Sequence, residues 1–67
     1  MTGAEVGAVW DIYVTARGRW EPATITSITD GVAKLKYWSP EAVGQSCVTE
    51  LINLRLLPQT FRPHQPG

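Results

Sequence analysis

Hydrophobic and polar residues alternate with a period of two on both sides of Asp30-Gly31. Alanine and isoleucine alternate with threonine before this pair, and alanine, leucine and tyrosine alternate with lysine after it. Such alternation is typical of half-buried strands, and an Asp-Gly pair tolerates the positive φ of a tight turn. The pattern therefore predicts a β-hairpin with strands at residues 20–28 and 32–38. The expected core residues of this hairpin are Ala23, Ile25, Ala33 and Leu35, with Tyr37 at the open end of the core, its mouth.

Two residues of the first hairpin strand depart from a regular ladder. Ile28 is out of register with Ala23 and Ile25, which predicts a β-bulge before the turn. Pro22 has no N–H to donate, so we expect that end of the strand at an edge or a bulge.

The residues before and after the hairpin predict further short strands. Residues 6–14 are β-branched and aromatic. Trp10, Ile12 and Val14 are expected on the core face, and Asp11 and Tyr13 on the other. A short fourth strand is expected at residues 46–50.

Residues 51–57 fit either a helix or a strand, because their leucines recur at helical spacing in a segment too short for a stable isolated helix. We interpret this segment as a single 3-10 turn at residues 51–53 and a last strand at residues 54–57, which Pro58 ends.

The ends and the longest loop are polar. Residues 1–5 are expected to form a flexible N-terminus, residues 41–45 a surface loop, and residues 59–67 a disordered, proline-rich tail. A single domain is therefore predicted at residues 6–58. Its elements describe an all-β fold, a small five-stranded barrel, which leaves few strand edges open.

Composition narrows the classes of partner. The 67 residues include six basic and six acidic side chains, so no net charge draws the chain toward nucleic acid or a membrane. Cys47 is the single cysteine, which excludes an internal disulfide and a cysteine-based zinc site. No apolar run approaches the ~20 residues of a membrane span. We expect a cytoplasmic protein without a membrane partner.

Several motifs resemble a Tudor-type domain of the SH3-like barrel family: Val6-Gly7, a turn at Gly18, the run WEPATI from residue 20, and LRLLP at residues 54–58. The resemblance covers residues 6–58 and implies a five-stranded barrel with a 3-10 turn before the last strand. Tudor domains that bind methylated arginine or lysine use an aromatic cage. The matching positions fall near Val14, Glu21, Tyr37 and Pro40, of which only Tyr37 is aromatic, so a methyl mark is not the first ligand expected.

The residues nearest to the mouth of the predicted barrel form the candidate ligand-binding rim: Tyr13, Glu21, Tyr37 and Trp38. Aromatic side chains with a polar edge suit peptide recognition, and Glu21 could complement a cationic ligand. The alternative is that so small a domain needs these aromatics for its core. We predict a non-enzymatic module that binds a protein or peptide.

A second candidate surface is the outward face of the hairpin, with Trp20, Lys34, Lys36 and Trp38. Tryptophans beside lysines can stack on bases while neutralising phosphates, which makes single-stranded nucleic-acid binding an alternative function. In the simpler interpretation, the lysines protect an exposed sheet face and Trp20 packs on a neighbour. The same face could also be a homo-oligomer interface, and the sequence leaves the oligomeric state open.

Catalysis has little support in the sequence. Cys47 has no histidine nearby, the carboxylates are scattered, and neither a glycine-rich phosphate loop nor a set of metal ligands is present. We expect no enzyme activity, no metal and no cofactor.

Overall fold

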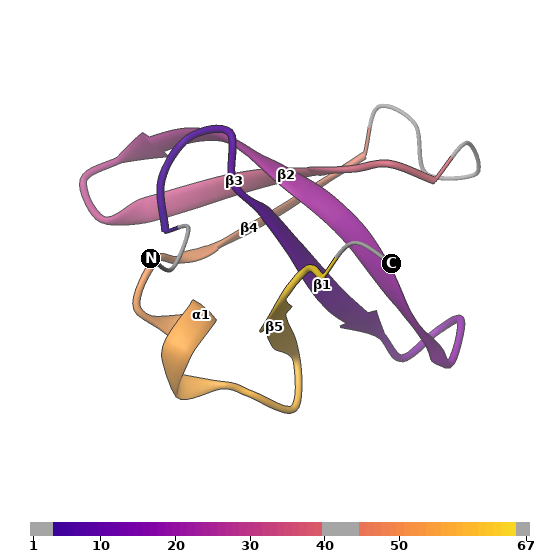
Figure 1. Ribbon diagram of the computed structural model, residues 1–67. Helices are drawn as coiled ribbons and strands as arrows, with labels where there is room; N and C mark the ends of the chain where they lie inside the picture. Colours follow the sequence, from indigo (N-terminus) through magenta and orange to yellow (C-terminus); the bar gives the residue numbers. More distant parts are fainter. Residues whose placement is uncertain (1–3, 40–44, 66–67) are drawn as a thin grey trace.

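The computed structural model describes residues 4–39 and 45–65. Five antiparallel strands form one sheet in the order β4-β3-β2-β1-β5, with a single short helix between the last two strands of the chain (Figure 1). The elements are β1 (Val9–Val14), β2 (Arg19–Thr29), β3 (Val32–Tyr37), β4 (Ser46–Glu50), α1 (Asn53–Leu56) and β5 (Phe61–Pro63). The all-β, five-stranded part of the predicted fold class is thereby confirmed, whereas closure of the sheet into a barrel is not.

The hairpin of β2 and β3 forms as the alternation predicts. Asp30 and Gly31 have φ values of 51° and 76°, which are the positive values that a two-residue hairpin turn requires. The pairing register shifts between Ile25 and Ser27, so the predicted bulge is confirmed. The extra residue places Ile28 opposite Ala33 and returns its side chain to the edge of the core.

Pro22 lies in β2, which is a central strand, and comes before Ala23, whose pairing with Tyr37 is the last in the β2–β3 ladder. The Pro22 carbonyl accepts a hydrogen bond from the Trp38 N–H at 3.0 Å, so this carbonyl points to the β3 side of the strand. Because β3 ends at Tyr37, the proline meets the end of that strand.

One face of the sheet forms the hydrophobic core. The four hairpin residues expected there are fully buried, and Trp10 and Ile12 of β1 join them. Leu54 of α1 and Phe61 of β5 close the cluster from the C-terminal side. The core is therefore shared by β1, β2, β3, α1 and β5.

The predicted last strand at residues 54–57 is wrong, because this segment contains α1. Hydrogen bonds from the Leu54 N–H to the Leu51 carbonyl and from the Arg55 N–H to the Ile52 carbonyl begin a turn, as expected, but the turn continues as a helix to Leu56. Packing decides between the two structures: helical spacing buries Leu54 against Phe61 while the other apolar residues of the segment face outward.

The predicted disordered tail contains the last strand. β5 pairs with β1, with Phe61 opposite Ile12 and Pro63 opposite Trp10. Phe61 is 5% exposed, and burying so large a side chain offsets the entropy of ordering a short polar segment. The domain boundary expected at Pro58 is therefore wrong, since ordered structure continues beyond it. Residues 1–3, 40–44 and 66–67, which include parts of both expected ends and of the expected loop, lie outside the described residues.

The sheet remains open in the described part of the chain. β4 and β5 form its two edges, no ladder joins them in residues 4–39 and 45–65, and α1 contacts both. The described strands therefore form an open sheet with α1 beside its two edges.

The position of β5 in the core predicts a large effect of Phe61→Ala. Truncating a buried phenylalanine costs about 3–5 kcal/mol, which is a large share of the stability of a small domain. Urea unfolding followed by tryptophan fluorescence measures the loss. The control is Gln59→Ala in the exposed turn before β5, which we expect to change stability by less than about 0.5 kcal/mol. Equal losses for the two variants would contradict the core position of Phe61.

Candidate functional site

The four residues of the predicted rim lie on opposite faces of the sheet. Glu21 is opposite Ile12 in the β1–β2 ladder, which places it on the core face. Tyr37 is opposite Ala23 and shares that face. Tyr13 and Trp38, in contrast, belong to the outward face, because the alternation of side chains separates them from the buried residues. The structure therefore does not bring the predicted rim together as one site.

Glu21 lies at the mouth of the core and is neutralised within the chain. Its Oε2 atom is 2.7 Å from Nε of Arg19 and 3.6 Å from Nη1 of Arg17. The residue is only 6% exposed, and a buried carboxylate depends strongly on such partners. The negative charge expected to complement a cationic ligand is thus already paired with two guanidinium groups.

The cavity beside Glu21 is small. Its volume is about 80 Å³, well below the ~300–1,000 Å³ typical of small-molecule sites. Among the described residues, Tyr37 is the single aromatic one of its lining, with Val14, Arg17, Glu21 and Gln45. This geometry gives no aromatic enclosure for a methylated cation.

Tyr37 and Cys47 form a half-buried polar pair on the core face. Burial raises the pKa of the Cys47 thiol, and a hydrogen bond from Tyr37 to the thiolate partly opposes this. Burial also raises the pKa of the Tyr37 hydroxyl, with further contributions from Cys47 and Glu21. Both groups therefore remain protonated at neutral pH, and neither is activated as a nucleophile.

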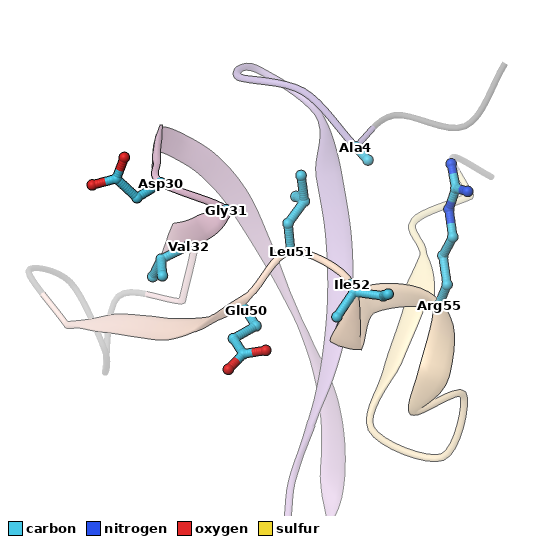
Figure 2. A pocket seen from close by; sticks show the side chains of 8 residues that line it. All are labelled: Ala4, Asp30, Gly31, Val32, Glu50, Leu51, Ile52 and Arg55. Atoms are coloured by element: carbon cyan, nitrogen blue, oxygen red, sulfur yellow. The ribbon is translucent and has the colours of Figure 1, made fainter.

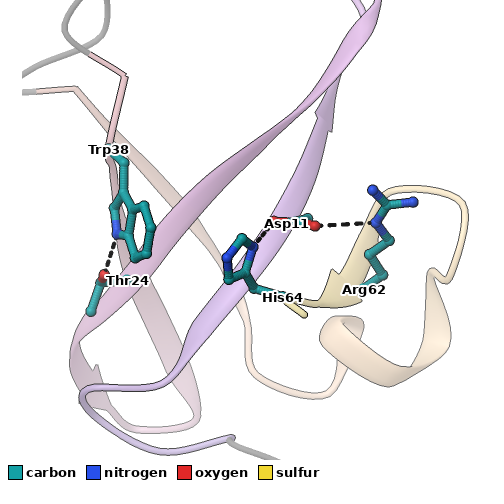
Figure 3. A network of polar contacts seen from close by, with 5 residues as sticks. All are labelled: Asp11, Thr24, Trp38, Arg62 and His64. Atoms are coloured by element: carbon teal, nitrogen blue, oxygen red, sulfur yellow. Dashed lines mark hydrogen bonds and ion pairs between the residues drawn. The ribbon is translucent and has the colours of Figure 1, made fainter. Parts of the chain in front are cut away.

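The outward face contains a polar network that the sequence analysis missed (Figure 3). The Asp11 carboxylate accepts a hydrogen bond from Nδ1 of His64 at 2.7 Å and one from Nε of Arg62 at 3.2 Å. Asp11 is only 8% exposed although it points away from the core. The two side chains of the C-terminal segment therefore cover and pair a carboxylate of β1.

The aromatic residues of the outward face extend this network across the sheet. The Arg62 guanidinium lies 4.1 Å from the centroid of the Trp20 ring, a cation–π distance. The Trp20 ring makes an edge contact with Tyr13 at a centroid distance of 5.4 Å. Trp20 thus packs on its neighbours, which was the simpler of the two interpretations of this residue.

Trp38 is held at the other end of the same face. Its indole Nε1 donates a hydrogen bond to Oγ1 of Thr24 at 2.6 Å, and its ring lies 5.3 Å from that of His64 (Figure 3). Even so, Trp38 is 50% exposed. An oriented and accessible indole therefore lies at the end of β3.

Lys34 and Lys36 precede Trp38 on the outward face of β3, and both are exposed. Within the described ranges, neither ammonium group forms an ion pair or a hydrogen bond. The structure therefore separates the outward face into a neutralised part, around Asp11, and an uncompensated positive part, around Lys34, Lys36 and Trp38.

A larger cavity lies elsewhere, between the hairpin turn and the link from β4 to α1 (Figure 2). It measures about 600 Å³. Figure 2 shows the Asp30 and Glu50 carboxylates pointing in different directions, so they do not converge on one ligand atom. The remaining labelled residues of the lining are Ala4, Gly31, Val32, Leu51, Ile52 and Arg55.

The described part of the chain contains no cluster of three His, Cys, Asp or Glu side chains able to hold a metal ion. It also contains no helix with the length and apolar character of a membrane span. Comparison of the chain with protein-family models, with curated proteins and with solved structures found no match.

The half-buried thiol of Cys47 predicts a fall in stability at alkaline pH. Since the pKa of Cys47 is higher in the folded than in the unfolded chain, the native state keeps the proton longer, and its stability falls as pH rises above about 8.5. Cys47→Ala should flatten this decline between about pH 8.5 and 10, whereas Tyr37 still contributes above that range. Unfolding free energies measured from pH 6 to 10 test this. Parallel curves for the two proteins would contradict it.

The Asp11 network predicts that the carboxylate charge holds β5 in place. Asp11→Asn keeps the shape but weakens charged hydrogen bonds, and we expect a loss of about 1–3 kcal/mol. Exchange of the His64 amide, which bonds the Val9 carbonyl, should become faster. Asp30→Asn is the matched control, because asparagine also tolerates the positive φ of the hairpin turn. Equal losses in urea unfolding for the two variants would refute this role.

Proposed function

We propose that the chain is a non-enzymatic binding module that recognises an acidic, extended segment of a protein or peptide. The observation that supports this most directly is the half-exposed Trp38 beside Lys36 and Lys34 on one sheet face. Of the rim predicted from the sequence, Trp38 is the member that this proposal retains as the anchor. Glu21 and Tyr37 instead stabilise the mouth of the core.

The geometry of Trp38 favours recognition, because the ring is already oriented. Thr24 and His64 hold the indole from two sides, so little conformational entropy is lost when a partner covers it. A rigid aromatic ring with a large accessible area is typical of residues that dominate binding energy.

The two lysines define the chemistry of the partner. Lys34, Lys36 and Trp38 follow one another at every second position, a spacing of about 6.6–6.8 Å along a strand. An extended peptide has the same repeat, so carboxylates at alternate positions can face the lysines while an apolar side chain covers the indole. Such contacts at a surface speed association and weaken with salt.

The fold proposed for this module is an SH3-like, Tudor-like barrel. Five consecutive antiparallel strands with one short helix before the last of them support it. A methylated cation is not the ligand proposed, since Glu21 is paired with Arg17 and Arg19 and Tyr37 lacks aromatic partners in its cavity.

Single-stranded nucleic acid is the second candidate ligand of the same surface. Trp20, Trp38, Lys34 and Lys36 share the outward face, which favours base stacking with neutralisation of phosphates. Arg62 already stacks on Trp20, however, and this leaves Trp38 as the more accessible ring.

A titration with two peptide pools tests the proposal. One pool of nine-residue peptides has two glutamates and one apolar residue at successive alternate positions, so that all three side chains share one face, and the matched pool has lysine in place of glutamate. We expect the glutamate pool to shift the NMR signals of Lys34, Lys36 and the Trp38 indole. Lys36→Glu should weaken binding about tenfold, or about 1.4 kcal/mol, and Trp38→Ala should weaken it further. Arg55→Glu, which makes the same charge change on α1, is the control.

Three results would contradict peptide recognition at this surface: no shifts with the glutamate pool at millimolar concentration, stronger binding of the lysine pool, or shifts confined to another face. An oligothymidine that quenches tryptophan fluorescence with steep salt dependence, while the peptides do not bind, would favour the nucleic-acid alternative.

A further inference from the structure

β4 is an edge strand with an open side. In the described part of the chain its one ladder partner is β3. The Gln45 carbonyl accepts from the Tyr37 N–H, and the Leu51 N–H donates to the Gly31 carbonyl, so odd-numbered residues direct their backbone groups toward the hairpin. By the alternation of an antiparallel ladder, Ser46, Val48 and Glu50 direct their N–H and C=O groups to the open side.

This edge lacks the features that usually prevent strands from pairing. Exposed edges are commonly protected by lysine, proline or a bulge. The sequence of β4 is SCVTE, without lysine or proline, and its register with β3 runs without a shift from Glu50 to Ser46. At the centre of the strand, Val48 is 65% exposed.

We infer that a second copy of this chain pairs with β4 through its own β4, antiparallel, about a twofold axis at Val48. In that register Val48 lies opposite itself, and Ser46 lies opposite Glu50 of the second copy. Each of these positions offers both an N–H and a C=O, so about six backbone hydrogen bonds form across the axis. No like charges oppose one another.

Charge complementarity favours a second copy over an unrelated peptide. Lys36 lies opposite Ser46 in the β3–β4 ladder. Glu50 of the second copy follows Ser46 in the same row, about 9–10 Å from the Lys36 backbone, a distance that the two long side chains can span. Within the described residues, the side chains of Lys36 and Glu50 have no ionic partner of their own. In the symmetric pair, Lys36 of each copy gains Glu50 of the other copy as its ionic partner.

The pairing would also extend the core face of the sheet. Cys47 and Thr49 are half-buried on the inner side of β4. Across the twofold axis, Cys47 would lie opposite Thr49 of the second copy. This interface lies on the strand edge and differs from the outward hairpin face that the sequence offered for an oligomer. Lys36 belongs both to this interface and to the proposed peptide surface, whereas Trp38, the anchor of that surface, lies outside the interface.

Sedimentation equilibrium from about 1 μM to 1 mM tests the dimer. Val48→Lys places two ammonium groups together at the twofold axis, and we expect it to weaken the dimer at least tenfold. Val48→Thr, which keeps a β-branched side chain, should dimerise like the unmodified protein. Glu50→Lys should weaken the dimer, and Lys36→Glu in the same chain should restore it.

Amide exchange in the unmodified protein provides a readout that needs no variant. The amides of Ser46, Val48 and Glu50 should become protected as concentration rises, whereas those of Cys47 and Thr49 should be protected at every concentration. A monomer at 1 mM, a dimer unaffected by Val48→Lys, or protection independent of concentration would overturn the inference. A monomer whose β4 instead binds a foreign peptide would overturn it as well.

Discussion

The outward face depends on one buried charge, the Asp11 carboxylate. A carboxylate in a largely covered position needs partners, and both of its partners, Arg62 and His64, come from the far end of the chain. Phe61, which precedes them, is buried in the core, so neighbouring residues of one segment fix β5 from both sides of the sheet. The orientation of Trp38 follows, because His64 lies between Asp11 and this ring.

The same constraint explains how a chain without net charge can present a charged surface. The charges of six acidic and six basic residues cancel in the sequence. In the fold, however, some of these residues form ion pairs and others do not. Glu21 is paired with Arg17 and Arg19, and Asp11 with Arg62 and His64. The lysines of β3 receive no such partner in the described ranges. A local positive surface beside an oriented indole is the consequence, and the proposed binding of an acidic partner depends on this surface.

Local patterns were sufficient to predict the hairpin, its bulge and its four core residues, because each depends on neighbours in the sequence. They failed where packing between distant segments decides. A short leucine-rich segment fits helix or strand until Phe61 is placed beside Leu54. The proline-rich composition after Pro58 concealed β5, since one buried phenylalanine outweighs it. The prediction of the rim was wrong for a different reason. Strict alternation along β1 already places Tyr13 on the other face from Ile12, and Ile12 lies opposite Glu21. The resemblance to an aromatic cage had nevertheless grouped Tyr13 with Glu21.

The two edges of the sheet differ in how well they resist pairing. β5 has three residues, ends at a proline and presents Arg62 beside it, all features that discourage a further strand. β4 has a regular five-residue ladder with an exposed valine at its centre and none of these protections. A domain with one protected and one unprotected edge tends to associate through the unprotected one. Since antiparallel pairing of β4 with itself opposes no like charges, the asymmetry of the edges favours a closed pair over an open filament.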